Sequence, residues 1–272
     1  MTEIFRSPTG IVGSVLLSII AAAVLLGPFL APYDPQEFHP AVRLQGPSAA
    51  HWLGTDQFGR DLLSRILHGS RATVAFGLGA TGLGVLAGSI IGITAGVAGG
   101  WFDSAIMRTM DGFLAVPDLL FTLLIVTMLG GGVGHAMIAV AIAFTPGMAR
   151  IARSAVLSIR TREYVLAAVA RGEFTGYIIS REVIPNAIGP IIVEATIRVS
   201  FAIMIGATLG FLGLGAQPPS TEWGLMVAEA RQFMFRSAWV VAVPGIAIAI
   251  AALGFNLFGD ALRDALDPRR RR

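Results

Sequence analysis

The sequence contains no cysteine and no lysine, and each absence excludes a kind of chemistry. Without thiols the chain forms no disulfide and offers no thiolate ligand to a metal. All 20 basic residues are arginines, so the chain lacks the lysine with which a P-loop reaches the β- and γ-phosphates of ATP. The chain is therefore not a P-loop ATPase, and any ATP that drives it must be hydrolysed by a partner.

Charged residues are scarce as well. They make up 14% of the 272 residues, whereas soluble domains carry about 25%, and 54% of the residues are hydrophobic. This composition indicates an integral membrane protein with helices that cross about 30 Å of hydrocarbon. Six apolar runs fall at about 11–31, 73–99, 112–129, 136–157, 188–213 and 238–258. The first is longer than the apolar core of about 7–15 residues in a signal peptide, which favours a membrane span over a cleaved signal.

The arginines are divided unevenly between the two sides of such a chain. Six spans put both ends on one side, and that side receives Arg6, Arg108, Arg150, Arg153, Arg160, Arg162, Arg171, Arg181, Arg263 and Arg269 to Arg272. The other side receives Arg43, Arg60, Arg65, Arg71, Arg231 and Arg236, and Arg198 falls within a span. Because arginine is enriched in cytoplasmic loops, both termini and the central loop are expected in the cytoplasm.

Small residues mark the second span. Gly84, Gly88, Gly92 and Gly96 recur every four residues and therefore lie on one helix face. Glycine lets membrane helices approach closely, so this face is expected to be a packing seam. A direct role in a pore is the less favoured alternative.

The longest charged stretch in the second half of the chain is 160–186. Tyr164, Ala167 and Ala168 follow helical spacing up to Gly172, and a second helical stretch at about 174–183 precedes Pro185. Glycine accepts positive φ at a sharp break, and proline is not expected to continue the second helix. The pattern predicts an L-shaped helix-turn-helix outside the membrane, with a small-residue face and a basic rim.

This stretch resembles the cytoplasmic "EAA" loop of bacterial ABC importer permeases. The loop's pattern is Glu-Ala-Ala, three residues, Gly, nine residues and Ile-x-Leu-Pro, and Ala167, Ala168, Gly172 and Pro185 stand at the matching positions. The sequence departs from the pattern at two positions, where it has Leu166 in place of the Glu and Glu182 in place of the Ile. Glu163 lies one helical turn before Leu166 and offers a carboxylate from nearby.

Four further blocks resemble one branch of these permeases, the second permease of peptide and nickel importers. The blocks are 54–65, 101–117, 211–224 and 255–268. The first contains Gly-Thr-Asp-x-x-Gly-Arg-Asp, and the third contains Phe-Leu-Gly-Leu-Gly-Ala-Gln-Pro-Pro. Together they cover most of the chain from Gly54 onward.

The resemblance implies an all-α integral membrane protein with the six-helix permease fold of type I ABC importers and a cytoplasmic coupling helix-turn-helix. It divides the chain into an N-terminal helix with an extracytoplasmic segment (1–71), a five-helix core (72–262) and a basic cytoplasmic tail (263–272). The core contains a coupling loop at 160–186 and an extracytoplasmic loop at 214–236.

The resemblance also implies partners, namely a homologous permease, two ATP-binding subunits and an extracytoplasmic solute-binding protein. ATP and Mg would be bound by the ATPase subunits, and no cofactor or metal is expected in this chain. The residues expected to couple to the ATPase are Arg162, Glu163, Tyr164, Ala167, Ala168, Arg171, Gly172 and Pro185.

One pair of charges lies inside the fifth span. Glu194 and Arg198 are four residues apart and share a helix face. An unpaired charge at mid-span costs about 2.5–3.5 kcal/mol on insertion, so such residues usually face a bundle interior or a water-filled path. One hypothesis is that the pair lines the translocation path, and the alternative is a self-neutralising pair that touches the partner permease.

Two outer segments carry further candidates. In 214–236, Glu222, Trp223, Met226 and Arg231 belong to a helical stretch that either meets the solute-binding protein or gates the pore, or else only anchors the last span at the interface. In the segment 32–70, a helical period in 58–66 predicts a helix at the membrane interface or over the spans. Three histidines in 32–70 lack paired spacing, which favours solvated loop residues over a metal site.

Two other classes of protein fit less well. An ATP-independent channel or secondary transporter would carry ionisable residues at several broken helices, and the sequence offers one clear mid-span pair. A membrane enzyme would need a ligand or triad constellation, and the spacing suggests none. Within the importer hypothesis the cargo is expected to be di- or oligopeptides, with nickel, glutathione or opines as alternatives.

Overall fold

The computed structural model describes residues 7–266, so Arg6 and Arg269 to Arg272 lie outside the described part of the chain. Within residues 7–266 every regular element is a helix, and one isolated β-bridge joins Thr55 to Asp61. The elements are α1 (Pro8–Leu30), η2 (Pro40–Val42), α2 (Leu62–Ala98), α3 (Gly100–Leu114), α4 (Asp118–Leu129), α5 (Val133–Arg160), α6 (Glu163–Ala170), α7 (Thr175–Tyr177), η3 (Ile178–Val183), α8 (Ile184–Phe211), α9 (Trp223–Ala230), η4 (Arg231–Phe233) and α10 (Trp239–Leu266).

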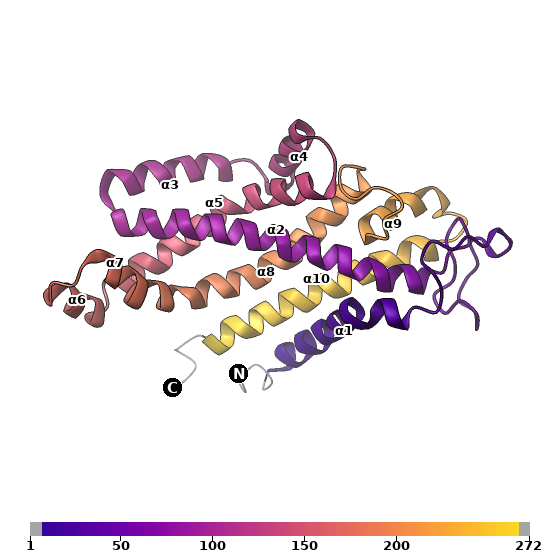
Figure 1. Ribbon diagram of the computed structural model, residues 1–272, viewed down its shortest axis with the longest axis horizontal. Coiled ribbons are helices and arrows are strands. Elements are labelled where there is room, and N and C mark those ends of the chain that lie inside the picture. The colour runs from indigo at the N-terminus through magenta and orange to yellow at the C-terminus, as the bar shows by residue number, and fades with distance from the viewer. Residues whose placement is uncertain (1–6, 267–272) are drawn as a thin grey trace.

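The helices form an elongated bundle (Figure 1). α6 and α7 lie at one end, which we call the α6 end, and α9 with the segment 31–61 lies at the other, the α9 end. The start of α1 and the end of α10 both point toward the α6 end, as expected for a chain whose ends share one side (Figure 1).

Five helical stretches are long and apolar enough to cross a membrane: α1, α2, α5, α10 and the continuous stretch Thr175–Phe211. The expected third span, 112–129, differs from this pattern. It is divided between α3 and α4, which meet at an angle of 89° and make the sixth span if they cross together. The break falls at Pro117, because a proline disfavours helical backbone in the residue before it and lacks an N–H of its own.

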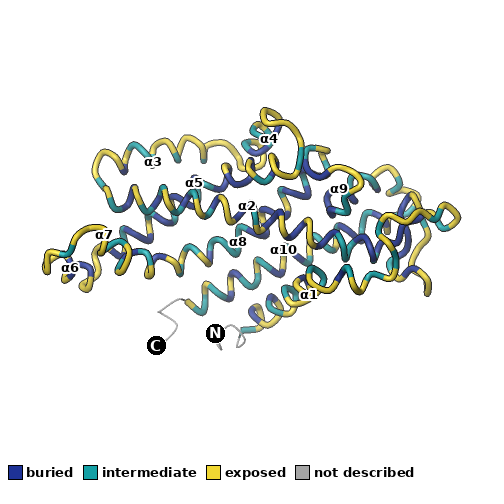
Figure 2. The backbone as a smooth tube through the Cα atoms, in the orientation of Figure 1, coloured by how far each residue is buried: buried dark blue, intermediate teal, exposed yellow. Residues whose placement is uncertain are grey.

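The predicted glycine seam is confirmed, and it joins α2 to α5. A Cβ on Gly92 would lie 2.1 Å from the carbonyl oxygen of Ala149, and one on Gly88 would lie 2.6 Å from that of Thr145. Glycine is therefore required where the two backbones come closest. This contact forms the centre of the bundle, and Figure 2 shows that α5 is more buried than α3.

A proline inside α1 is compensated by an arginine from α2. Pro28 has no N–H to donate to the carbonyl of Val24, four residues earlier. The guanidinium of Arg71 donates to that carbonyl from Nε at 2.7 Å and to the carbonyl of Leu25 from Nη2 at 3.2 Å. The contact ties α1 to α2 where the helical ladder of α1 is incomplete.

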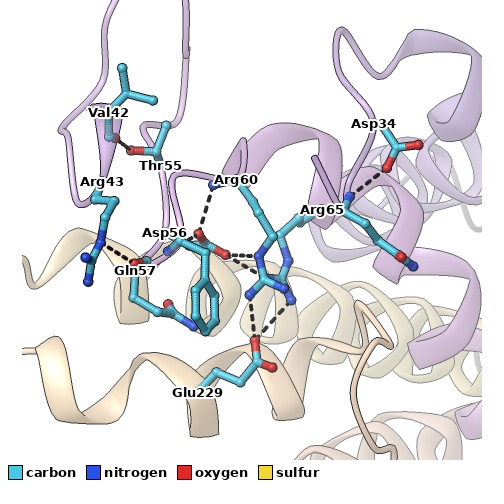
Figure 3. A network of polar contacts seen from close by, with 11 residues as sticks. Asp34, Val42, Arg43, Thr55, Asp56, Gln57, Arg60, Arg65 and Glu229 are labelled. Carbon is cyan, nitrogen blue, oxygen red and sulfur yellow. Dashed lines mark hydrogen bonds and ion pairs between the residues drawn. The ribbon is translucent and has the colours of Figure 1, made fainter. Parts of the chain in front are cut away.

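The segment 31–61 is fastened to the bundle by buried charges. Asp56 Oδ2 accepts from Arg60 Nε and Arg65 Nη1, each at 2.5 Å, and Glu229 of α9 bridges the two arginines at 2.9 and 3.2 Å (Figure 3). Arg65 is only 1% exposed. We call Asp56, Arg60, Arg65 and Glu229 the outer network.

Contacts around Asp61 correct two expectations, the start of the second span and the solvated setting of His51. The second span does not begin at Thr73, because Asp61 caps α2 by accepting from the N–H of Ser64 at 2.8 Å, and the helix starts at Leu62. The polar side chains of residues 60–65 are buried and have polar partners within the protein. His51 is buried too, with its Nδ1 at 3.0 Å from Asp61 Oδ1, so it is no solvated loop residue.

Candidate functional site

The break predicted at Gly172 is confirmed. α6 ends at Ala170, and Gly172 has φ +76°, a conformation in which L side chains are strained. Its N–H donates to the carbonyl of Val169 at 2.9 Å, and the N–H of Glu173 donates to that of Ala168 at 3.2 Å. This pair of hydrogen bonds is the Schellman arrangement, which satisfies the last carbonyls of a helix while turning the chain.

The prediction that the second helix ends before Pro185 is wrong. α7, η3 and α8 follow one another without a break, and Pro185 is the second residue of α8. η3 is a π-helical turn in which the N–H of Ile184 donates to the carbonyl of Ile179, five residues earlier. The turn shifts the hydrogen-bond register just before the proline, so Pro185 sits in a first helical turn, where a missing N–H is tolerated.

α6 has one buried face and one exposed face. Val165 and Ala168 are 3% and 0% exposed, and they pack in an apolar cluster with Val156, Ile159 and Val183. The opposite face carries Tyr164, Leu166, Ala167 and Val169, and Phe174 and Tyr177 follow directly after the turn. The small-residue pair is thus divided, since Ala168 seats α6 on the bundle and Ala167 is exposed.

The exposed side of this region is an apolar patch with charges around it. Leu166 and Val169 are 56% and 57% exposed, and Phe174 is 72% exposed. We call Tyr164, Leu166, Val169, Phe174 and Tyr177 the α6 patch. Arg162 and Glu163 are exposed at the start of α6, and Arg171 forms an ion pair with Glu173 at 2.7 Å.

A cavity of about 760 Å³ lies between α6 and the helices behind it. Its lining combines residues of α5, Arg162 and Tyr164 at α6, Asn186 to Ile197 along α8, and the end of α10. We call it the α6 cavity. It has three charged lining residues, which are Arg162, Glu194 and Arg263.

Glu194 and Arg198 form the expected pair, with Arg198 Nε 3.1 Å from Glu194 Oε1. The arginine then crosses to α5, where its guanidinium lies 5.0 Å from the ring centre of Phe144 and against Gly147. Glu194 faces the α6 cavity, so the two members of the pair face different surroundings.

The structure brings together further charges that the sequence placed outside the spans. Asp103 of α3 binds Arg153 of α5 through two hydrogen bonds of 2.5 Å. One helical turn away, Arg150 pairs with Asp111, and both side chains are more than half exposed. The acidic residues at 103 and 111 were the available signal. These ion pairs were not predicted, because the apolar run that places the third span starts only at 112, after both acidic residues.

Most of the four candidate residues at the α9 end are buried, whereas a docking or gating surface was expected. Glu222 caps α9 by accepting from the N–H groups of Gly224 and Leu225 at 2.9 and 2.8 Å. Glu222, Trp223 and Met226 are 7%, 1% and 4% exposed, whereas Arg231 is exposed and lies over the ring of Phe211. Burial raises the pKa of the Glu222 carboxyl, and the two backbone donors oppose that rise. Three of the four thus hold α9 in place and offer little surface to a partner.

The comparisons with known proteins agree with this architecture. Residues 88–272 match the family described as "Binding-protein-dependent transport system inner membrane component". The chain belongs to this family. Residues 2–47 of the permease match a second description, "N-terminal TM domain of oligopeptide transport permease C". As a member of this family the permease is a membrane subunit of an ABC importer and is not itself the ATPase.

Similar proteins cover nearly the whole permease. It is 42% identical to "Dipeptide transport system permease protein DppC" of Alkalihalophilus pseudofirmus, over 98% of this chain and 88% of that protein. It is also 42% identical to "Probable D,D-dipeptide transport system permease protein DdpC" of Escherichia coli, over 97% and 88%. "Glutathione transport system permease protein GsiD" of Pectobacterium atrosepticum is 38% identical over 97% and 88%.

A solved structure shows the same fold. A chain of the inward-facing MetNI methionine ABC transporter aligns with a TM-score of 0.62 at 18% identity, over 75% of this permease and 96% of that chain. The expected all-α fold of a type I ABC importer permease is thereby confirmed.

Proposed function

We propose that this permease forms the translocation path of an ATP-driven importer of di- and oligopeptides, together with a homologous permease. Two ATP-binding subunits would bind ATP and Mg and dock at the α6 end, and a solute-binding protein would deliver cargo at the α9 end. The observation that carries the proposal is the α6 patch. It exposes three large apolar side chains on α6, which is closed by a Schellman turn and seated on the spans by Ala168, and two more directly after that turn.

The α6 patch has the chemistry of a docking surface in water. Clustered apolar side chains rimmed by charges are costly to leave exposed, which favours cover by a partner. Arg162, Glu163 and Arg171 surround the patch, where they can meet charges on the ATPase. ATP binding shifts the two permeases between inward- and outward-open states only through its different affinity for each state.

The orientation of the permease in the membrane follows from the proposed docking of the ATPase at the α6 end. The α6 end is cytoplasmic in this proposal, as the excess of arginine indicates, and both termini lie there. The segment 31–61 and α9 are then extracytoplasmic. Arg231 remains a candidate for contact with the solute-binding protein because it is exposed, and Glu222, Trp223 and Met226 would act by holding α9.

Peptide cargo is supported by the names of the relatives and by the charges of the bundle. Two of the relatives are described as dipeptide permeases and one as a glutathione permease, and glutathione is itself a peptide. We assign Glu194 and Arg198 to the translocation path, because a carboxylate beside a cavity suits a zwitterionic solute. The competing assignment, a pair buried against the partner permease, predicts that Arg198→Leu abolishes assembly.

The coupling role is tested by Gly172→Pro. Proline cannot adopt a φ of +76° and cannot donate to Val169, so the substitution should displace α6 while leaving the spans in place. In reconstituted complexes we expect at least a tenfold loss of ATP hydrolysis stimulated by the binding protein, together with loss of dipeptide uptake.

The matched control is Gly130→Pro, which imposes the same backbone conflict at the end of α4, where φ is +89°. We expect that variant to retain coupling. The proposal would be wrong if Gly172→Pro assembled and still coupled hydrolysis to uptake.

A further inference from the structure

The bend between α3 and α4 lies beside the middle of a spanning helix. α3 is tied to the second half of α5 by the ion pair of Asp103 with Arg153, and α4 packs in an apolar cluster with Ala136 and Val140 of the first half. The two helices meet at an angle of 89° around Pro117. Because α5 is long and apolar enough to cross the membrane, this bend lies at the depth of the hydrocarbon.

The bend is exposed and polar. We call residues 111–120 the α3–α4 corner, and all of them except Leu114 are exposed. α4 begins without a side-chain cap, so the N–H groups of residues 118–120 have no acceptor within the described range 7–266. The carboxylate of Asp118 has no ion-pair partner in that range, and the side chain of Asp111 is more than half exposed. The corner thus presents free backbone donors and two carboxylates on the outside of the bundle.

Lipid is a poor neighbour for the α3–α4 corner. Hydrocarbon offers no acceptor to a free N–H group, so non-helical backbone at membrane depth occurs where protein covers it or where it lines a water-filled cavity. Ionisable side chains within spans likewise face protein or water. The corner therefore requires a neighbour other than lipid, from outside this chain.

α1 has the opposite character on the other long side of the bundle (Figure 1). The exposed residues of α1 from Ile11 to Leu30 carry no charge, and Leu26 and Phe29 are 51% and 82% exposed. Ser18 is the exposed hydroxyl among them, and it donates to the carbonyl of Ser14 at 2.7 Å within the helix. This side suits lipid tails, so the two long sides of the permease differ in the neighbour they fit.

We propose that the α3–α4 corner is the surface on which the homologous permease packs within the membrane. The inference rests on the proposed function and adds the surface through which the two permeases meet. In that function the ATPase and the solute-binding protein contact the two ends of the bundle, so the second permease is the neighbour that remains for a polar lateral surface. Its facing side is expected to offer a hydrogen-bond donor to Asp118 and acceptors to the free N–H groups of α4.

The test places the photoreactive residue p-benzoylphenylalanine at Leu120, which is 57% exposed, or in a second variant at Val116. Leu26 of α1, a leucine of similar exposure, is the matched control position. The complete complex is irradiated in lipid vesicles, and the products are identified by mass spectrometry. We expect the corner positions to label the homologous permease at least tenfold more than Leu26 does, and we expect Leu26 to label lipid.

Asp118→Leu gives a second readout whose direction depends on the neighbour. Leucine suits lipid, so a lipid-facing position would keep or improve assembly, whereas a position against the partner loses the donor that its carboxylate binds. We expect the two permeases to associate about tenfold more weakly, equivalent to about 1.4 kcal/mol, with partial recovery in Asp118→Asn. Ser18→Leu, at an exposed polar position of α1, is the control and should assemble as wild type.

Labelling of lipid alone from both corner positions would overturn the interface. The same conclusion would follow if neither position labelled protein and Leu120→Cys, the single thiol of this otherwise cysteine-free chain, reacted with a water-soluble maleimide. Either result in a complex that still couples hydrolysis to uptake refutes the interface alone. A Gly172→Pro complex that stays coupled refutes the coupling role and leaves the labelling result intact.

Discussion

Arg71 and Pro28 illustrate how single residues substitute for a missing backbone donor in this bundle. The guanidinium of Arg71 reaches the carbonyls of Val24 and Leu25, which lie just before the proline in α1. In hydrocarbon a carbonyl without a donor costs free energy, so the side chain replaces what the proline lacks. The contact joins the first two spans of the bundle.

Arg71→Leu should therefore destabilise the permease by about 1–3 kcal/mol, the range for hydrogen bonds from charged groups and unsatisfied carbonyls. In a Pro28→Ala background the effect should be clearly smaller, because an alanine at that position has an N–H to donate to the carbonyl of Val24. Apparent melting temperatures of the four proteins in detergent measure this coupling. Equal shifts in both backgrounds would show that Arg71 acts otherwise.

The glycines of helix α2 contribute unequally to its packing against α5. Gly92→Ala places a methyl 2.1 Å from the carbonyl oxygen of Ala149, so α2 and α5 must separate. We expect a loss of about 1–3 kcal/mol, as for other overpacked sites, and a fall of about 2–4 °C in melting temperature per kcal/mol.

Gly82→Ala is the matched control within the same helix. Nothing lies within 4 Å of a Cβ at Gly82, and alanine has the higher helix propensity. That variant should be as stable as wild type or slightly more stable. If the two substitutions had the same effect, the α2–α5 contact would not be the close seam described here.

The elements were predictable where composition alone decides them. Long apolar runs predicted that α1, α5, α8 and α10 exist, but the stretch containing α8 begins earlier, at Thr175, and α10 continues to Leu266. Gly172 predicted the end of α6 because glycine adopts positive φ without steric cost. Tertiary contacts decided the rest. Pro185 is accommodated by a π turn that no local pattern signals, and Arg65 enters α2 because Asp56 and Glu229 are there to neutralise it.

The candidate site was likewise predictable from the sequence only in part. The loop residues were found by their resemblance to a known loop pattern, whereas the pairing of Asp111 with Arg150 depends on how α3 folds back beside α5. The α6 cavity also joins residues from four helices, and Arg162 and Arg263 are a hundred residues apart. That both line one cavity follows only from the packed bundle.

The outer network unites the segment 31–61, α2 and α9. Glu229→Ala leaves the buried Arg60 and Arg65 to share Asp56, so we expect a loss of about 3–5 kcal/mol, as when one partner of a buried ion pair is removed. The segment should also be cleaved faster by protease in vesicles that expose the α9 end.

Glu37→Gln is the control for this prediction, because Glu37 belongs to the same segment and its contact with His39 is exposed. Such a pair contributes less than about 1 kcal/mol. Unchanged cleavage in Glu229→Ala would mean that the segment is held by its apolar contacts and not by the network.

The stretch Thr175–Phe211 runs without interruption from the turn after α6 to the far part of the bundle. At 1.5 Å per residue its 37 residues measure about 55 Å, longer than the hydrocarbon they cross. A tilt of about 5° around its midpoint would move each end by about 2.4 Å in opposite directions, by the same helix length. A displacement of the helix end near α6 would thus move the other end in the opposite direction. The π turn at η3 lies within this stretch, at the end nearest α6, where such a displacement would enter.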